Sequence, residues 1–222
     1  MAEGDLGVAP AGYPKGVPAR RRTPWNKGVS VGQKKTFSPA DVQRLRTGIQ
    51  RRGSRSSLRD LALFNLAIDA MASVPDVLAL RVRHVRQRNG RIRRIVGIPI
   101  SSGSVRECIL TPATMEALQA WLKVAQLKPD DPIFPGRTDI GLTARQMTRL
   151  LKEWCEAGGL DPAPYGCESL RRTKAVYIFG KTGDIDAVRV LLGHQKLEST
   201  VRFLDVTRSR ADALAIAEKY PL

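Results

Sequence analysis

The stretch SLRRTKAVYIFGKTGDIDAVRVLLGHQKLESTVRFLDV, residues 169–206, carries the pattern that decides the fold. We expect helices at about 168–180, 184–192 and 196–204, with a further one at 209–219. No internal repeat is visible in the chain. The C-terminal part of the chain is therefore predicted to be helical throughout.

Helices are also predicted upstream, beginning at FSPADVQRLRTGIQ, residues 37–50. Ser38 is placed to cap that helix, with Pro39 at its first position and Asp41 in its first turn. The following segment, 57–71, is apolar nearly all round, so we expect it at the centre of the core. Pro75 opens another short helix.

The middle of the chain contains the only strand signals. RIRRIVGIPI (91–100) and VRECIL (105–110) are rich in β-branched residues and are separated by SSGS, which predicts a hairpin. Helices follow at 112–125 and after Thr143, the latter ended by Gly158 and Gly159. The predicted fold class is mostly α with a small antiparallel β-sheet, α+β.

The composition indicates a nucleic-acid partner. The 222 residues hold 37 Lys and Arg against 21 Asp and Glu, for a formal net charge of +16 and a pI near 10.5. This excess is the electrostatic footprint of a DNA or RNA binder. The alternative is a ribosome-associated or simply soluble basic protein.

Cysteine and histidine usage gives no sign of a metal or cofactor. The three cysteines form no CxxC pair, and there are only two histidines. No apolar signal segment or membrane-length run is seen, so we expect no membrane association. The expected location is a bacterial cytoplasm with access to the nucleoid.

Two parts are predicted along the chain. Residues 1–36 are rich in Gly, Pro and basic residues and indicate a flexible basic arm, and residues 37–222 form the domain. Trp25 is unusual in such an arm, and docking on the domain is favoured over stacking on a base. The charge of the arm comes from Arg20, Arg21, Arg22, Lys27, Lys34 and Lys35.

Several motifs together resemble one family. LLGHxxxxST with a preceding LRRT, within 169–206, is similar to the C-terminal half of tyrosine recombinases, also called phage integrases. RDLALFNLAIDAM (59–71) and DVLALRVRHV (76–85) resemble the first half of the same domain, and PWNKG resembles the lead-in of small integrase-like proteins. The resemblance implies the catalytic-domain fold of that family over residues 37–222.

The resemblance also implies a set of positions for strand cleavage. In the family a tyrosine attacks a DNA phosphate, two arginines stabilise the charge, and a lysine and further His or Trp groups assist proton transfer. The matching positions here are Ser73 and Arg171 for the arginines, Ser101 for the lysine, Glu168 and His194 for the histidines, and Phe203 for the tyrosine.

Only Arg171 and His194 keep the family residue. Phe203 has the ring without the hydroxyl, and Ser73 lacks a guanidinium. We therefore expect an inactive homologue that is not an enzyme. Glu168 is predicted to pair with Arg171 or Arg172.

Binding to double-stranded DNA is the expected function. By the resemblance, the helix after Thr143 enters the major groove, and its candidates for base readout are Thr143, Arg145, Gln146 and Arg149. Candidates around the former phosphate pocket are Arg171, Arg172, Lys174, Lys181 and His194. Candidates for backbone contacts are Arg81, Arg83, Arg86, Arg91, Arg93 and Arg94.

Two biological roles stay open. The first is a transcriptional regulator or silencer, and the second is an accessory subunit of an active recombinase. The helix at 209–219 is a candidate for self-association or for docking on its own domain. The sequence does not choose between these, nor does it reveal the DNA site.

Overall fold

The computed structural model describes residues 33–100, 103–136 and 141–205. Ser101, Trp25, the arm residues before 33 and the predicted helix at 209–219 lie outside these ranges. The predicted fold class is confirmed, since the described chain is mostly helical with one two-stranded antiparallel sheet. The elements are α1 (Pro39–Arg51), α2 (Arg55–Ala70), α3 (Val74–Leu78), α4 (Val82–Val85), β1 (Ile95–Pro99), β2 (Val105–Ile109), α5 (Pro112–Ala125), α6 (Ala144–Ala157), α7 (Cys167–Thr182), α8 (Ile185–Leu192) and α9 (Leu197–Leu204).

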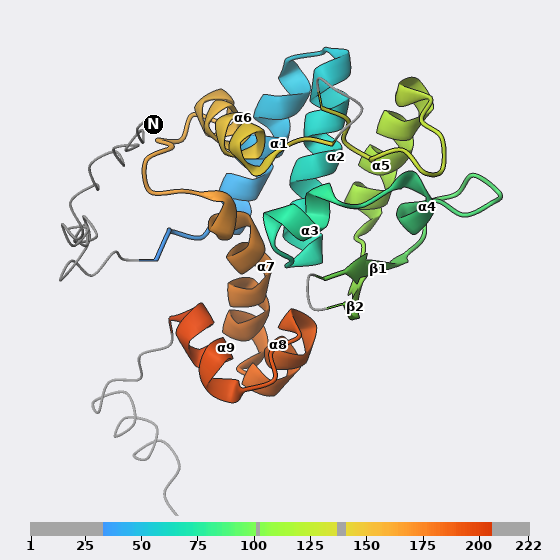
Figure 1. Cartoon of the computed structure of the whole chain (residues 1–222). Helices are drawn as coiled ribbons and strands as arrows, with labels where there is room; N and C mark the ends of the chain where they lie inside the picture. The colour runs from blue at the N-terminus through green and yellow to red at the C-terminus, as the bar shows by residue number, and fades with distance from the viewer. Residues whose placement is uncertain (1–32, 101–102, 137–140, 206–222) are drawn as a thin grey trace, which may run out of the picture. The chain divides into compact units, whose positions relative to one another are not determined.

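Helix α2 lies at the centre, as its apolar sequence predicts. Figure 1 shows it between α1 and α5, and α7 also packs against it. Its side chains Leu63, Phe64 and Leu66 are completely buried. The helix begins at Arg55 rather than Ser57 because Ser54 forms a capping box with Ser57, whose backbone N donates to Ser54 Oγ at 3.2 Å.

A buried carboxylate joins α2 to α5 and α7. Asp69, 4% exposed, accepts from Lys174 Nζ at 2.8 Å and from Thr114 Oγ1 at 2.6 Å. It also accepts from the backbone N of Thr111 at 2.7 Å and from the hydroxyl of that residue at 2.8 Å. The charge of Asp69 is thereby paired and hydrogen-bonded, which a buried charge requires.

The hairpin predicted from the β-branched runs is present. Strands β1 and β2 pair with Gly97 opposite Glu107. Val96, Ile98 and Cys108 face the core, whereas alternate side chains on the other face are exposed. The short helix α4, inside the basic segment 81–94, was not predicted.

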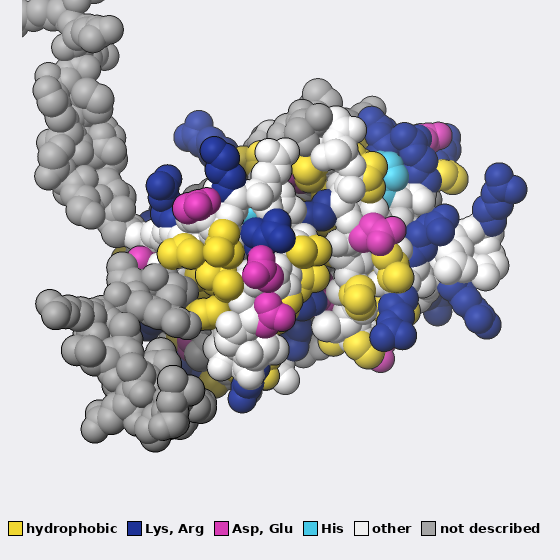
Figure 2. All heavy atoms as spheres, turned by 90° about the horizontal axis from the view of Figure 1, so that it is seen from below, with side chains coloured by type: hydrophobic (Ala, Val, Ile, Leu, Met, Phe, Trp, Pro, Cys, Tyr) yellow, Lys and Arg dark blue, Asp and Glu magenta, His cyan; other side chains and the backbone are white. Residues whose placement is uncertain are grey.

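Helices α7, α8 and α9 build a second, smaller core. They bury Ala175, Val188, Leu192 and Leu204 together with Met71 from the end of α2. Figure 1 shows α8 and α9 at the far end of α7. Figure 2 views the molecule from this end and shows apolar side chains exposed between basic and acidic groups; Val190, Leu197 and Val201 are among the exposed ones.

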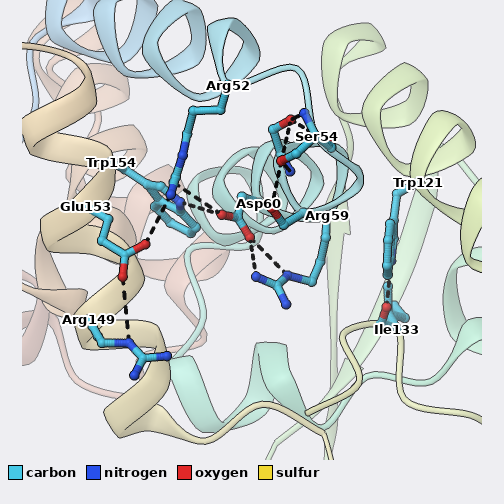
Figure 3. A network of polar contacts seen from close by, with 11 residues as sticks. Arg52, Ser54, Arg59, Asp60, Trp121, Ile133, Arg149, Glu153 and Trp154 are labelled. Atoms are coloured by element: carbon cyan, nitrogen blue, oxygen red, sulfur yellow. Dashed lines mark hydrogen bonds and ion pairs between the residues drawn. The ribbon is translucent and has the colours of Figure 1, made fainter. Parts of the chain in front are cut away.

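A polar network fixes α6 to the core (Figure 3). Asp60 of α2, 1% exposed, accepts from Trp154 Nε1 at 3.2 Å and from Arg59 NH2 at 2.7 Å. Arg52, which follows α1, lies 3.8 Å from Asp60 and 3.4 Å from Glu153 of α6. Figure 3 shows Arg52, Arg59 and Trp154 converging on Asp60, so a buried charge as well as apolar packing joins α6 to α2.

The described part of the chain contains no helix that is long and apolar enough to cross a membrane. The same residues offer no group of three or more His, Cys, Asp or Glu side chains arranged for a metal ion. All three cysteines are free thiols. Burial is the main cause that raises the pKa of Cys108 and that of Cys155, each to about 11.

Candidate nucleic-acid interface

The N-terminal turn of α6 is exposed and capped. Thr143 Oγ1 accepts from Gln146 N at 3.2 Å, and Gln146 Oε1 accepts from Thr143 N at 2.8 Å. Gln146 therefore has its side-chain oxygen engaged in the capping box, and only its Nε2 is left to contact a base. The side chain of Arg145 is exposed and makes no hydrogen bond or ion pair with the rest of the described chain. A shallow hollow on this face is lined by Thr143, Arg145, Gln146, Thr148, Arg149 and Lys152.

Arg149 lies one turn further along α6 and belongs to the network of Figure 3. Its Nε is 3.7 Å from Glu153, the residue that also pairs with Arg52. The Arg149 side chain is 73% exposed. A contact to nucleic acid by Arg149 would have to share or replace this weak surface pair.

Arg171 of α7 contacts several of the residues that the family motifs predicted to lie together. Its Nε donates to the carbonyl of Met71 at 3.2 Å, and its guanidinium lies over the ring of Phe203 at 5.0 Å. Its NH1 is 3.9 Å from Glu168, so the predicted pairing of Glu168 is found with Arg171. The phenyl ring of residue 203 has no hydroxyl, and a phosphotyrosine link made by this chain would need a different tyrosine.

His194 lies beside the same ring. It contacts Phe203 edge-on with the ring centroids 5.5 Å apart, and its Nδ1 shares a hydrogen bond of 3.1 Å with Thr200 Oγ1. Burial lowers the pKa of His194, and the positive charges of Arg171 and Arg106 lower it further. The structure thus brings Arg171, His194 and Phe203 together.

Ser73, which the motif comparison predicts at the position of the family's first arginine, caps α3. Its hydroxyl donates to Asp76 Oδ2 at 2.5 Å and accepts from Asp76 N at 3.3 Å. A serine here satisfies the helix end but places no positive charge beside Arg171.

Three further basic residues were predicted around the pocket, and of these Arg172 does contact Phe203, with its guanidinium 5.9 Å from the centroid of that ring. Arg172 is buried, with Nε donating to Phe203 O at 2.8 Å and NH1 to Lys34 O at 2.7 Å. Lys174 is engaged by Asp69, and Lys181 lies near the end of α7 beside Tyr177. Arg172 and Lys174 therefore hold the fold together in this structure.

Residues 33–36, which we counted in the flexible arm, are attached to the domain. Gln33 Nε2 donates to Arg202 O at 2.6 Å, and Lys34 Nζ donates to Ala163 O at 3.0 Å. Lys35 N donates to Pro164 O at 3.0 Å. The arm as predicted thus ends in a docked strand-like segment beside the loop before α7.

The basic segment 81–94 is mostly exposed. Arg83 forms an ion pair with Asp130, and Arg81 donates to the carbonyl of the same residue. Arg86 Nε donates to Gly90 O at 3.2 Å, which holds the turn. Exposed side chains that remain available for a phosphate are Arg88, Arg91, Arg93 and Arg94.

One residue at the pocket was missed from the sequence. Arg106 of β2 donates through NH1 to Leu192 O at 2.8 Å and through NH2 to Ala70 O at 2.9 Å. Its strand position gave no signal, because the contact with α2 and α8 joins residues far apart in sequence.

The architecture described here is that of the tyrosine recombinase catalytic domain. The chain belongs to the Phage integrase family, whose sequence profile matches residues 35–210. The family predicted from the motifs at 59–85 and 169–206 is therefore confirmed.

The chain is similar to tyrosine recombinase XerC of Shewanella amazonensis, with 30% identity over 148 residues, 65% of this chain and 48% of the relative. It is 26% identical to XerD of Pseudomonas putida over 189 residues, 81% of this chain and 60% of the relative. The chain thus spans about half of the length of these relatives. Among solved structures, the XerA recombinase has a TM-score of 0.67 at 16% identity, covering 86% of this chain and 67% of that chain.

Our prediction that the chain is not an enzyme was wrong on this comparison. The relatives it matches are named tyrosine recombinases, which are enzymes. The residues at positions 73, 168 and 203 therefore do not establish a loss of activity.

Proposed function

We propose that this chain binds double-stranded DNA with sequence preference through the N-terminal turn of α6. The observation that carries the proposal is Arg145, which is exposed on that turn and unpaired within the described residues. The hydrogen bond from Trp154 to Asp60 ties α6, the helix that carries Arg145, to α2. A guanidinium presented in this way can donate two hydrogen bonds to guanine O6 and N7.

Solved relatives support DNA as the partner. XerH recombinase is described as bound to its difH substrate, with a TM-score of 0.67 at 18% identity over 85% of this chain and 55% of that chain. The Tn1549 transposon integrase is described in complex with transposon right end DNA, with a TM-score of 0.66 at 16% identity over 86% of this chain and 67% of that chain. The net charge of +16 favours the same partner.

Arg145→Ala should reduce binding to the preferred site more than binding to random DNA, by about 1–3 kcal/mol of discrimination. The preferred site is first selected from a random duplex library, and both affinities are measured at one salt concentration. Arg91→Ala is the matched control. Arg91 is exposed on the basic segment, so its loss should reduce the affinity for both DNAs equally. Equal losses for Arg145→Ala on both DNAs would show that α6 does not read sequence.

Removal of residues 1–32 should weaken binding to all sequences and flatten its salt dependence. Each phosphate that the arm neutralises contributes about 0.9 to the slope of log K against log salt, and the deletion removes that contribution. The deletion stops at residue 32 so that the hydrogen bonds of Gln33 and Lys34 to the domain are kept. An unchanged slope in salt titrations of the truncated protein would remove the arm from the interface.

The biological role that we propose is at recombination sites, because the chain belongs to the Phage integrase family. Regulation of transcription stays a prediction. Genome-wide mapping of bound sites separates the two: sites at one attachment sequence support a role in recombination, and sites at promoters support regulation.

A further inference from the structure

Arg106 and Arg171 both bond the C-terminal end of α2. Arg106 donates to the carbonyl of Ala70 at 2.9 Å, and Arg171 donates to the next carbonyl, that of Met71, at 3.2 Å. Because the two acceptor carbonyls belong to successive residues at the end of α2, the two guanidiniums lie close together.

Arg106 also reaches the turn that carries His194. Its NH1 donates to Leu192 O at 2.8 Å, and a Cβ added at Gly193 would lie 3.3 Å from Arg106 Cδ. The stem of Arg106 therefore lies against the residue that directly precedes His194. Strand β2, the end of α2 and the α8–α9 turn meet at this guanidinium.

Positive charge at this point is poorly compensated. Arg106 Nε is buried and has no hydrogen-bond partner among the described residues, which is rare for a charged donor. Within the same residues Arg106 makes no ion pair, while Arg171 has only Glu168 at 3.9 Å. The nearby carboxylate of Asp76 is held by the hydroxyl of Ser73 at 2.5 Å.

The pKa values of Arg106 and His194 are both lowered at this point. Burial lowers the pKa of Arg106, and Arg171 lowers it further. Burial lowers the pKa of His194, and the same two arginines lower it further. Among the nearby carboxylates, Asp76 raises the pKa of Arg106 and Glu168 lies 3.9 Å from Arg171. The two like charges still disfavour each other's charged form, and a bound anion would relieve the repulsion.

We propose that Arg106 and Arg171 together hold one phosphate group of the DNA backbone, with Arg106 supplying the guanidinium that Ser73 does not. The inference rests on the proposed DNA binding and names the partner of this pocket. A phosphodiester fits because its two non-bridging oxygens can each accept from a separate guanidinium. The phenyl ring of Phe203 lies against the Arg171 guanidinium, 5.0 Å from the ring centroid.

The test uses the selected duplex carrying one neutral methylphosphonate at a time. In the wild-type chain, one modified position should weaken binding by about tenfold or more, because a charge-assisted hydrogen bond is removed. Arg106→Gln should lower affinity for the unmodified duplex, and the same methylphosphonate should then cost nothing further. The affinity of Arg171→Gln should likewise not change when the methylphosphonate is placed at that position. Arg91→Gln removes an equal charge elsewhere and should keep that response.

Folding is checked by thermal melting, since Arg106 also ties two backbone carbonyls together. If Arg106→Gln does not fold, Arg106→Lys carries the test, because a retained ammonium should keep part of the response. A full response of the Arg106 variant at every position would overturn the assignment. Absence of any duplex binding by the wild-type chain would instead overturn the proposed function.

A free anion is the other occupant that this group of arginines could take. The probe for it is inorganic phosphate at about 10 mM, a concentration that populates a site with a Kd of ~1 mM. The melting temperature of the wild-type chain and of Arg106→Gln is measured with and without the phosphate. If phosphate raises the melting temperature of the wild type only, and the methylphosphonate responses of the two proteins are the same, the site binds a free anion and the assignment to DNA is wrong.

Discussion

Replacing Asp69 with Ala is expected to lower the free energy of unfolding by about 3–5 kcal/mol. The change leaves the ammonium of Lys174 without its partner at 2.8 Å and removes the acceptor of three further hydrogen bonds. These donors come from α5 and α7, so the loss is felt in both helices that pack on α2. Denaturant unfolding of the two proteins, followed by circular dichroism, measures the difference.

Asp186→Ala is the matched control for this prediction. Asp186 pairs with Arg189 at 3.0 Å, nearly the same distance, but its side chain is 69% exposed. An exposed pair of this kind contributes about 0–1 kcal/mol. Similar costs for the two substitutions would mean that the burial of Asp69 is unimportant to its contribution.

Gly48→Ala is expected to destabilise the chain by about 1–3 kcal/mol, although the same change usually stabilises a helix. A Cβ at residue 48 would lie 2.5 Å from Ala157 O and 2.8 Å from Gly158 N, both backbone atoms at the end of α6. Helices α1 and α6 would have to separate. Because α6 carries Arg145, we also expect weaker discrimination between DNA sequences.

Gly180→Ala, also a substitution within a helix, is expected to change stability in the opposite direction. Gly180 lies within α7, and a Cβ there would meet nothing within 4 Å. The substitution should therefore stabilise the chain by about 0.5–1 kcal/mol. If both glycine variants melt at higher temperature than wild type, the close approach of α1 and α6 is not a constraint.

Local signals predicted most of the fold. Helix α5 runs from Pro112 to Ala125 as expected, because proline favours the first helical position and the apolar spacing continues to the end. Thr143 caps α6 for a similarly local reason. Helix α2 begins two residues before the predicted Ser57, because Ser54 and Ser57 form a capping box at its start.

The pocket was predictable only where a family motif named the residue. Arg171 and His194 were found in this way and lie together. Arg172 also lies over the Phe203 ring, but its hydrogen bonds go to backbone carbonyls of Phe203 and Lys34, which no local pattern indicates. Lys174 points to Asp69 instead, since residues of one helix point to different sides. Arg106 was missed because its partners Ala70 and Leu192 are 36 and 86 residues away.

The three free cysteines have a practical consequence for labelling. A thiolate is the form that attacks maleimides, and the raised pKa of about 11 leaves Cys108 and Cys155 almost wholly protonated at neutral pH. Both are also buried, whereas Cys167, at the start of α7, is half-buried and lies 3.5 Å from Thr148 of α6. A fluorophore added to the native chain should attach at Cys167, next to the helix that we propose contacts DNA. The natural sequence therefore already contains an attachment point for a fluorescence reporter of binding.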